Sequence, residues 1–146
     1  MTIDRGRTRQ EFITIDTGSQ RGTVALRSDV DSTRLDVTVV DEAEIDGATL
    51  PFGAPSSVRR GGSALLWVLP TAGGRPICQA IAQKSVETLT PEVCTVTDAE
   101  GLSGDEGGGR HESGWVEVEG HQNGTCQYRV TYPASGAGTD LSIQIR

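Results

Sequence analysis

The chain has few aromatic residues, two histidines and no long apolar run. Aromatic residues make up 4% of its 146 residues, which argues against a large ligand pocket lined by aromatic rings. No apolar stretch approaches the roughly 18 residues that a membrane-spanning helix needs. The net charge is -7, so the phosphates of a nucleic acid would be repelled. These deficits predict neither a membrane segment nor a nucleic-acid partner.

The N-terminus also lacks the apolar segment of a secretory signal peptide, because Met1–Arg7 contains an aspartate and two arginines. We therefore expect either a protein made without a signal peptide or a chain that starts after a removed one. The three cysteines are Cys78, Cys94 and Cys126, and they form no Cys-x-x-Cys pair of the kind that binds structural zinc. They allow at most one disulfide, in any of three pairings, and the missing signal peptide favours three reduced thiols.

What the chain does contain is a series of short segments in which apolar residues alternate with polar ones. Leu35–Val39, Cys126–Tyr132 and Leu141–Ile145 show this period of two, which is typical of half-buried strands. Ala64–Leu69 is continuously apolar and predicts a central strand covered on both faces and ended by Pro70. A short helical turn near Gln83–Thr90 is the one helical alternative.

Glycine-rich turn signals separate these segments at intervals of roughly 8–12 residues, which is typical of a sandwich or barrel. Asn123-Gly124 predicts a hairpin that joins Trp115–Glu119 to Thr125–Tyr132. The sequence thus predicts an all-β fold, an antiparallel β-sandwich of about ten short strands that is immunoglobulin-like or jelly-roll-like. We expect a basic N-terminal arm over residues 1–10 and a single sandwich domain over residues 11–146.

The end of the chain resembles the closing hairpin of an immunoglobulin-like sandwich, because Cys126–Tyr132 is followed by a turn and by Leu141–Ile145. The order Cys…Trp…Cys of antibody domains is not met, since Trp67 precedes all three cysteines. This resemblance therefore concerns architecture and assigns no function.

One long segment, Asp98–Glu112, is acidic and rich in glycine, and it predicts a surface loop. Its carboxylates are calcium ligands by type, but their spacing is not that of an EF-hand. His111 and His121 lie at opposite ends of one predicted strand, roughly 30 Å apart, so one metal ion cannot bind both. We expect no metal site and no cofactor, and we interpret the segment as a solvated loop.

Asp16-Thr17-Gly18-Ser19 resembles the signature of aspartic proteases. The resemblance implies a dimer in which two aspartates share one proton. The later apolar-apolar-glycine segment of those enzymes has no counterpart here, because Pro70 follows the best apolar run, and a strand that ends in an Asx turn explains the same residues. The sequence therefore predicts no catalytic residue and no enzyme, with an aspartic protease as the remote alternative.

Two features predict contact with partners. Arg5, Arg7 and Arg9 form a basic arm, whereas seven acidic residues against one arginine lie between Asp29 and Asp46, and such complementary charges favour docking between like subunits. Trp115 is expected to point outward because Val116 and Val118 occupy the inward positions, and an exposed tryptophan suits a protein interface or a sugar. The predicted partner-binding residues are therefore Arg5, Arg7, Arg9 and Trp115.

Together these features predict a non-enzymatic structural protein that forms oligomers with protein subunits, like or unlike. The setting we expect is a virion or another extracellular assembly, for example as a capsid decoration protein or a tail protein. The alternative is a secreted or cell-surface β-sandwich that binds carbohydrate or protein through its loops.

Overall fold

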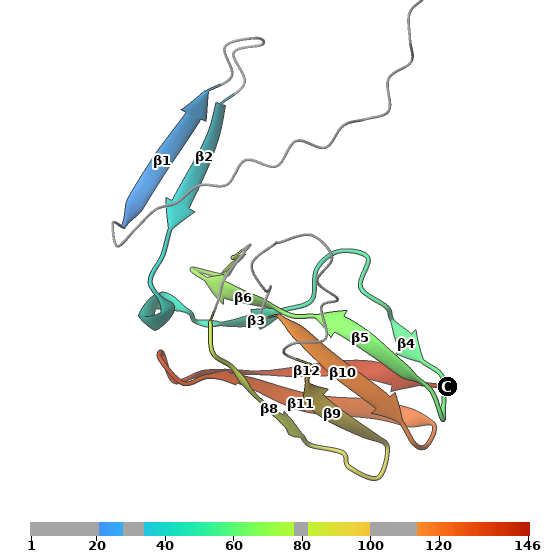
Figure 1. Cartoon of the computed structure of the whole chain (residues 1–146). Coiled ribbons are helices and arrows are strands. Elements are labelled where there is room, and N and C mark those ends of the chain that lie inside the picture. Colours follow the sequence, from blue (N-terminus) through green and yellow to red (C-terminus); the bar gives the residue numbers. More distant parts are fainter. Residues whose placement is uncertain (1–20, 28–33, 78–81, 100–113) are drawn as a thin grey trace, which may run out of the picture. The chain divides into compact units, whose positions relative to one another are not determined.

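The computed structural model describes residues 21–27, 34–77, 82–99 and 114–146, and the chain divides into two units after Val39. In the first unit, β1 (Gly22–Arg27) and β2 (Arg34–Val39) form an antiparallel hairpin (Figure 1). Its register sets Val24 opposite Val37 and Thr23 opposite Thr38. Because neighbouring residues of a strand face opposite sides, the hairpin has one apolar side and one polar side.

The second unit, Val40–Arg146, is built almost entirely of strands, which confirms the predicted all-β class. It begins with the short helix η1 (Glu42–Glu44), which Asp41 caps by accepting a hydrogen bond from the backbone of Ala43. The strands that follow are β3 (Gly47–Thr49), β4 (Ser57–Val58), β5 (Ser63–Trp67), β6 (Leu69–Ala72), β7 (Arg75–Pro76), β8 (Ser85–Thr88), β9 (Cys94–Asp98), β10 (Trp115–Gly120), β11 (Gly124–Tyr132) and β12 (Ala137–Ile145). No helix in the described ranges is long and apolar enough to cross a membrane.

Two sheets form the sandwich (Figure 1), with strand orders β5-β10-β9 and β4-β12-β11-β8. With β3, β6 and β7 set aside, the seven remaining strands follow the order of an immunoglobulin sandwich, in which strands B, E and D face strands G, F and C. At one side the sheets are joined by Thr88 of β8, whose hydroxyl accepts from the backbone N–H of Val96 at 2.9 Å and donates to its carbonyl at 3.3 Å. The structure therefore selects the immunoglobulin-like alternative over the jelly roll.

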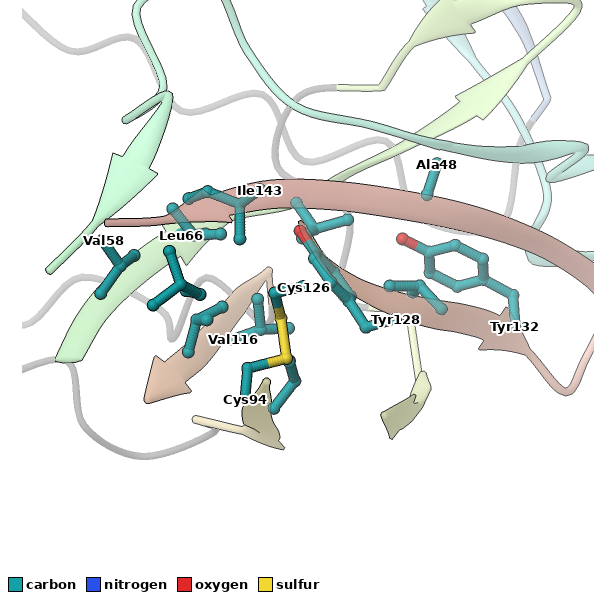
Figure 2. Packing of buried hydrophobic residues seen from close by; sticks show 14 of the residues in the cluster. Ala48, Val58, Leu66, Cys94, Val116, Cys126, Tyr128, Tyr132 and Ile143 are labelled. Carbon is teal, nitrogen blue, oxygen red and sulfur yellow. A yellow bond between two sulfur atoms is a disulfide. The ribbon is translucent and has the colours of Figure 1, made fainter. Parts of the chain in front are cut away.

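The core between the sheets is made by the inward residue of each alternating pair (Figure 2). One sheet contributes Leu66, Val116 and Val118, and the other contributes Tyr128 and Ile143, all at most 3% exposed. Each aliphatic side chain among them stabilises the fold by roughly 1.5–3 kcal/mol relative to an exposed position. The period of two that the sequence shows in Cys126–Tyr132 thus corresponds to the buried face of β11.

A disulfide between Cys94 of β9 and Cys126 of β11 links the two sheets through the middle of this core (Figure 2). The two Cα atoms are 5.6 Å apart and the residues are separated by 32 positions. The prediction of three reduced thiols is therefore wrong for this pair. The pairing depends on which sheet each strand joins, and the spacing of the cysteines along the chain does not encode this. Cys78 lies outside the described residues.

The hairpin predicted at Asn123-Gly124 is wrong, although a turn does occur there. β10 and β11 belong to facing sheets and do not pair. Backbone N–H groups of His121 and Gln122 donate to the carbonyl of Val93, and Gly124 has a φ of 155°, which glycine adopts far more readily than other residues. The segment is therefore a corner that takes the chain across the core.

The predicted central strand Ala64–Leu69 is also wrong in extent and position. β5 ends at Trp67, and β6 continues in a separate three-stranded sheet of order β3-β6-β7. Pro70 lies inside β6, opposite Ala48. Leu65 is 44% exposed, so β5 is not covered on both faces. Likewise the possible helical turn at Gln83–Thr90 is a strand, because Val86 pairs with Val130 and packs on the core.

The disulfide can be tested by counting thiols. We expect one free thiol in the unfolded, unreduced chain and three after reduction. Replacing both partners (C94A/C126A) removes the cross-link from the unfolded state and should lower the free energy of unfolding by about 3–4 kcal/mol, measured by urea denaturation. C78A is the matched control and should leave one disulfide in place. Three free thiols without reduction would contradict the assignment.

The two tyrosines provide a pH test. Burial raises the pKa of Tyr128 and that of Tyr132 to about 12, and neither hydroxyl has a hydrogen-bond partner in the described part of the chain. In the unfolded chain both ionise near pH 10, at roughly the unperturbed value. Their contribution to stability is therefore complete below about pH 10 and is lost as the pH rises toward 12.

Tyrosinate absorbance measures this directly, because the chain has only these two tyrosines. We expect the folded protein to show almost no tyrosinate signal at pH values where the urea-unfolded chain is already half ionised. The Y132F variant retains Tyr128 as its one tyrosine. It should show the same pH dependence with half the change in tyrosinate absorbance. Ionisation near pH 10 with an unchanged circular dichroism spectrum would be the contrary result.

Candidate partner-binding face

On the outer side of the β5-β10-β9 sheet lie the side chains that alternate along each strand with the core-facing ones. We call Leu65, Trp67, Trp115, Glu117 and Glu119 the tryptophan face. Leu66, Val116 and Val118 point inward, so their neighbours point outward by the period of two. The register sets Trp67 opposite Trp115, Leu65 opposite Glu117, and Ser63 opposite Glu119. The face is therefore apolar at one end and acidic at the other.

The two tryptophan rings stack on each other, with centroids 6.2 Å apart and planes inclined by 23°. Beside them, the N–H of Val68 donates to the carbonyl of Gly114 at 2.7 Å. Since bonded and non-bonded pairs alternate in an antiparallel ladder, the tryptophans occupy the next, non-bonded pair, where side chains lie closer together. Neither tryptophan is fully buried.

Gly114 is required for this packing. A Cβ atom at this position would come within 2.5 Å of the Trp67 ring and 2.7 Å of the Val68 carbonyl oxygen. Only a residue without a side chain therefore lets β10 start next to the indole of Trp67.

The acidic end of the face is supported from the neighbouring strand. Thr97 of β9 lies opposite Glu117, and Thr95 lies opposite Glu119. The Thr95 hydroxyl is 2.7 Å from Nε2 of His121. His121 is thus tied to the sheet surface by a threonine. The carboxylates of Glu117 and Glu119 remain the charged groups of the outer face of β10.

Of the predicted partner-binding residues, the structure describes Trp115, which points away from the core as the alternation predicts and is partly exposed. Arg5, Arg7 and Arg9 lie outside the described residues, and so do Asp16–Ser19, His111 and the greater part of the Asp98–Glu112 segment. Asp98 itself forms an ion pair of 2.6 Å with the buried ammonium of Lys84, so it anchors the end of β9.

Three residues of interest were not singled out from the sequence. The apolar run Ala64–Leu69 predicts that Leu65 and Trp67 are covered on both faces, and only the strand order places them on the outer side of a sheet. Phe52 is fully exposed on a turn in which the N–H of Ala54 donates to the carbonyl of Pro51 at 3.1 Å and Gly53 has a φ of 85°. Pro51-Phe52-Gly53 is a signal for such a turn.

The charged groups with shifted pKa values are structural. The hydrogen bond from Thr71, and then that from the backbone of Gly74, lower the pKa of Asp46, which holds the β6–β7 turn. Across the β11–β12 hairpin, the hydrogen bonds that Arg129 donates to Asp140 lower the pKa of Asp140 and raise that of Arg129. Among the described residues, no group of three or more histidine, cysteine or acidic side chains could hold a metal ion.

The packing of the tryptophan face can be tested with glycine substitutions. G114A should lower the free energy of unfolding by about 1–3 kcal/mol, because its methyl group overlaps the Trp67 ring and the backbone. G138A is the matched control, since a Cβ on that strand residue meets its nearest atom at an ordinary 3.4 Å. Urea denaturation of both variants gives the comparison, and equal stabilities would contradict the packing.

No family model and no curated protein matches the chain. Solved structures similar to it include domains 4 and 5 of the S-layer protein SbsC, with 17% identity, a TM-score of 0.48, and coverage of 86% of this chain and 65% of that chain. Domains 1–6 of the same surface layer protein give 17% identity and a TM-score of 0.43, with coverage of 77% of this chain and 14% of that chain. The chain spans less than two thirds of either structure.

Proposed function

We propose that this chain is a non-enzymatic structural module of an extracellular or cell-surface assembly, and that it binds like subunits through the tryptophan face. The observation that carries the proposal is the placement of both tryptophans and an exposed leucine on the outer side of one sheet. In a protein with so few aromatic residues, the two tryptophans are the largest apolar side chains, and they lie outside the core.

Such a patch is what a protein interface uses. Binding energy is concentrated in a few residues, with tryptophan the most enriched among them, and these are surrounded by a polar rim that excludes water. Here the indoles and Leu65 are the apolar centre, and Glu117 and Glu119 form one side of the rim. The acidic rim favours a basic segment on the partner.

The disulfide supports an extracellular or cell-surface location. A buried cross-link between the sheets persists in oxidising surroundings, such as cell surfaces, secreted proteins and virion surfaces, and it is rare in the cytosol. A capsid decoration or tail protein of a virion is the finer hypothesis within this class, and a component of a cell-surface layer is the other.

The chemistry-bearing side chains of the described residues also support a structural role. Cys94 and Cys126 are consumed by the disulfide, His121 is bonded to Thr95, and Lys84 is paired with Asp98. These groups hold strands together. The stacking of the two indoles on each other likewise favours a protein partner over a sugar, because each ring covers part of the other's flat face.

The proposal predicts that the purified full-length chain associates with itself in a concentration-dependent manner, measured by sedimentation velocity. W115A and L65A should each weaken this association at least tenfold, since each removes part of the apolar centre. L89A is the matched control, because Leu89 is an exposed leucine of the β8–β9 loop whose N–H donates to the carbonyl of Gln127 in the other sheet. A monomer at every concentration, or equal effects of all three variants, would overturn the proposal.

A further inference from the structure

Among the strands that the structure describes, β5 lies at the edge of its sheet. In the described part of the chain it pairs with β10 alone. In an immunoglobulin sandwich strand A continues the sheet beyond strand B, but here β4, the strand that precedes β5, pairs in parallel with β12 of the other sheet. The sequence of β5, Ser-Ala-Leu-Leu-Trp, contains none of the charges or prolines with which proteins protect an exposed edge.

The hydrogen-bond pattern shows which backbone groups face this open edge. Val68 is bonded to Gly114, and Gly120 donates to Gly62 at the other end of β5. Because bonded pairs alternate along an antiparallel ladder, Leu66 and Ala64 are bonded to β10. The N–H and C=O groups of Ser63, Leu65 and Trp67 therefore point to the side where no strand of the described residues lies, which is the requirement for adding a strand.

The sequence of residues 5–15, Arg-Gly-Arg-Thr-Arg-Gln-Glu-Phe-Ile-Thr-Ile, has the composition that this edge calls for. Arg5, Arg7 and Arg9 are spaced by two, so in a strand they share one side, and Glu117 and Glu119 have the same spacing on β10. The strand repeat of about 6.6 Å per two residues is therefore common to both rows of charges. An arginine beside Trp67 would also gain a cation–π contact.

We propose that residues 5–15 of one copy add as a strand to the free edge of β5 in a second copy, with their arginines turned toward Glu117 and Glu119. The contact is heterologous, since the arm and the edge are different surfaces, so each copy can receive one neighbour and donate to another. This inference rests on the proposed function and names the occupant of the tryptophan face and its edge.

A charge exchange tests it. The arm variant R7E/R9E and the face variant E117R/E119R should each weaken self-association of the full-length chain at least tenfold. An equimolar mixture should associate again, because each arm then meets a face of opposite charge. R75E/R146E, which changes the net charge as the arm variant does but at exposed sites elsewhere, should behave as the wild type.

The outcomes separate the two proposals. If W115A weakens association but the charge variants and their mixture do not follow this pattern, the tryptophan face binds a like subunit and the arm is not its occupant. If the mixture fails to associate although each variant is folded and each alone is weakened, the direct pairing of arm and face is overturned. Association that ignores every one of these substitutions overturns both proposals.

Hydrogen exchange tests the strand itself. On association, exchange of the N–H groups of Leu65 and Trp67 should slow at least tenfold, because they gain hydrogen-bond partners. The N–H of Leu66, already bonded within the sheet, is the internal control and should change little. Unchanged exchange at Leu65 and Trp67 in the associated protein would exclude strand addition at this edge.

Discussion

The fold depends on packing two sheets against each other with few aromatic side chains in the core between them. Tyr128 and Tyr132 are the only aromatic side chains in the described core, and the remainder of that core is valine, leucine, isoleucine, alanine and cysteine. Such small side chains bury less area each, so the cross-link between Cys94 and Cys126 supplies constraint where packing supplies less. Small domains commonly compensate for a limited core with a disulfide.

The small core makes the tryptophan face unexpected. A fold that needs apolar area would be expected to bury its two largest side chains, yet Trp67 and Trp115 both occupy outward positions and stack on each other there. Gly114 has no side chain where one would collide with Trp67, so the local sequence accommodates the pair. Placing the indoles outside lowers the stability available from the core, and a partner surface would recover that area.

The sequence predicts the strands and the pairing of the last two neighbours, but it does not predict which distant strands meet. Alternation in Cys126–Tyr132 and Leu141–Ile145 predicts β11 and β12, because each strand has one buried face. The resemblance to a closing hairpin implies that the two strands pair, as they do. Asn123-Gly124 predicts a hairpin, whereas the turn found there leads from β10 to β11 of the opposite sheet. The disulfide and the pairing of Trp67 with Trp115 depend on strand order across distant segments, so the candidate face was predicted only as the outward Trp115.

The open edge of β5 follows from the direction that the chain takes just before it. β4 is only two residues long and adds in parallel to the end of β12, after which Arg59–Gly62 turns the chain into the other sheet. Because β4 pairs with β12, it does not pair with β5. Among the described strands, β5 therefore has a neighbour on one side only. Exposed backbone donors and acceptors on an apolar strand attract another strand. Within the described residues this edge has no neighbouring strand and no charged protection, so a strand supplied by a second copy, as we propose, would satisfy its free backbone groups.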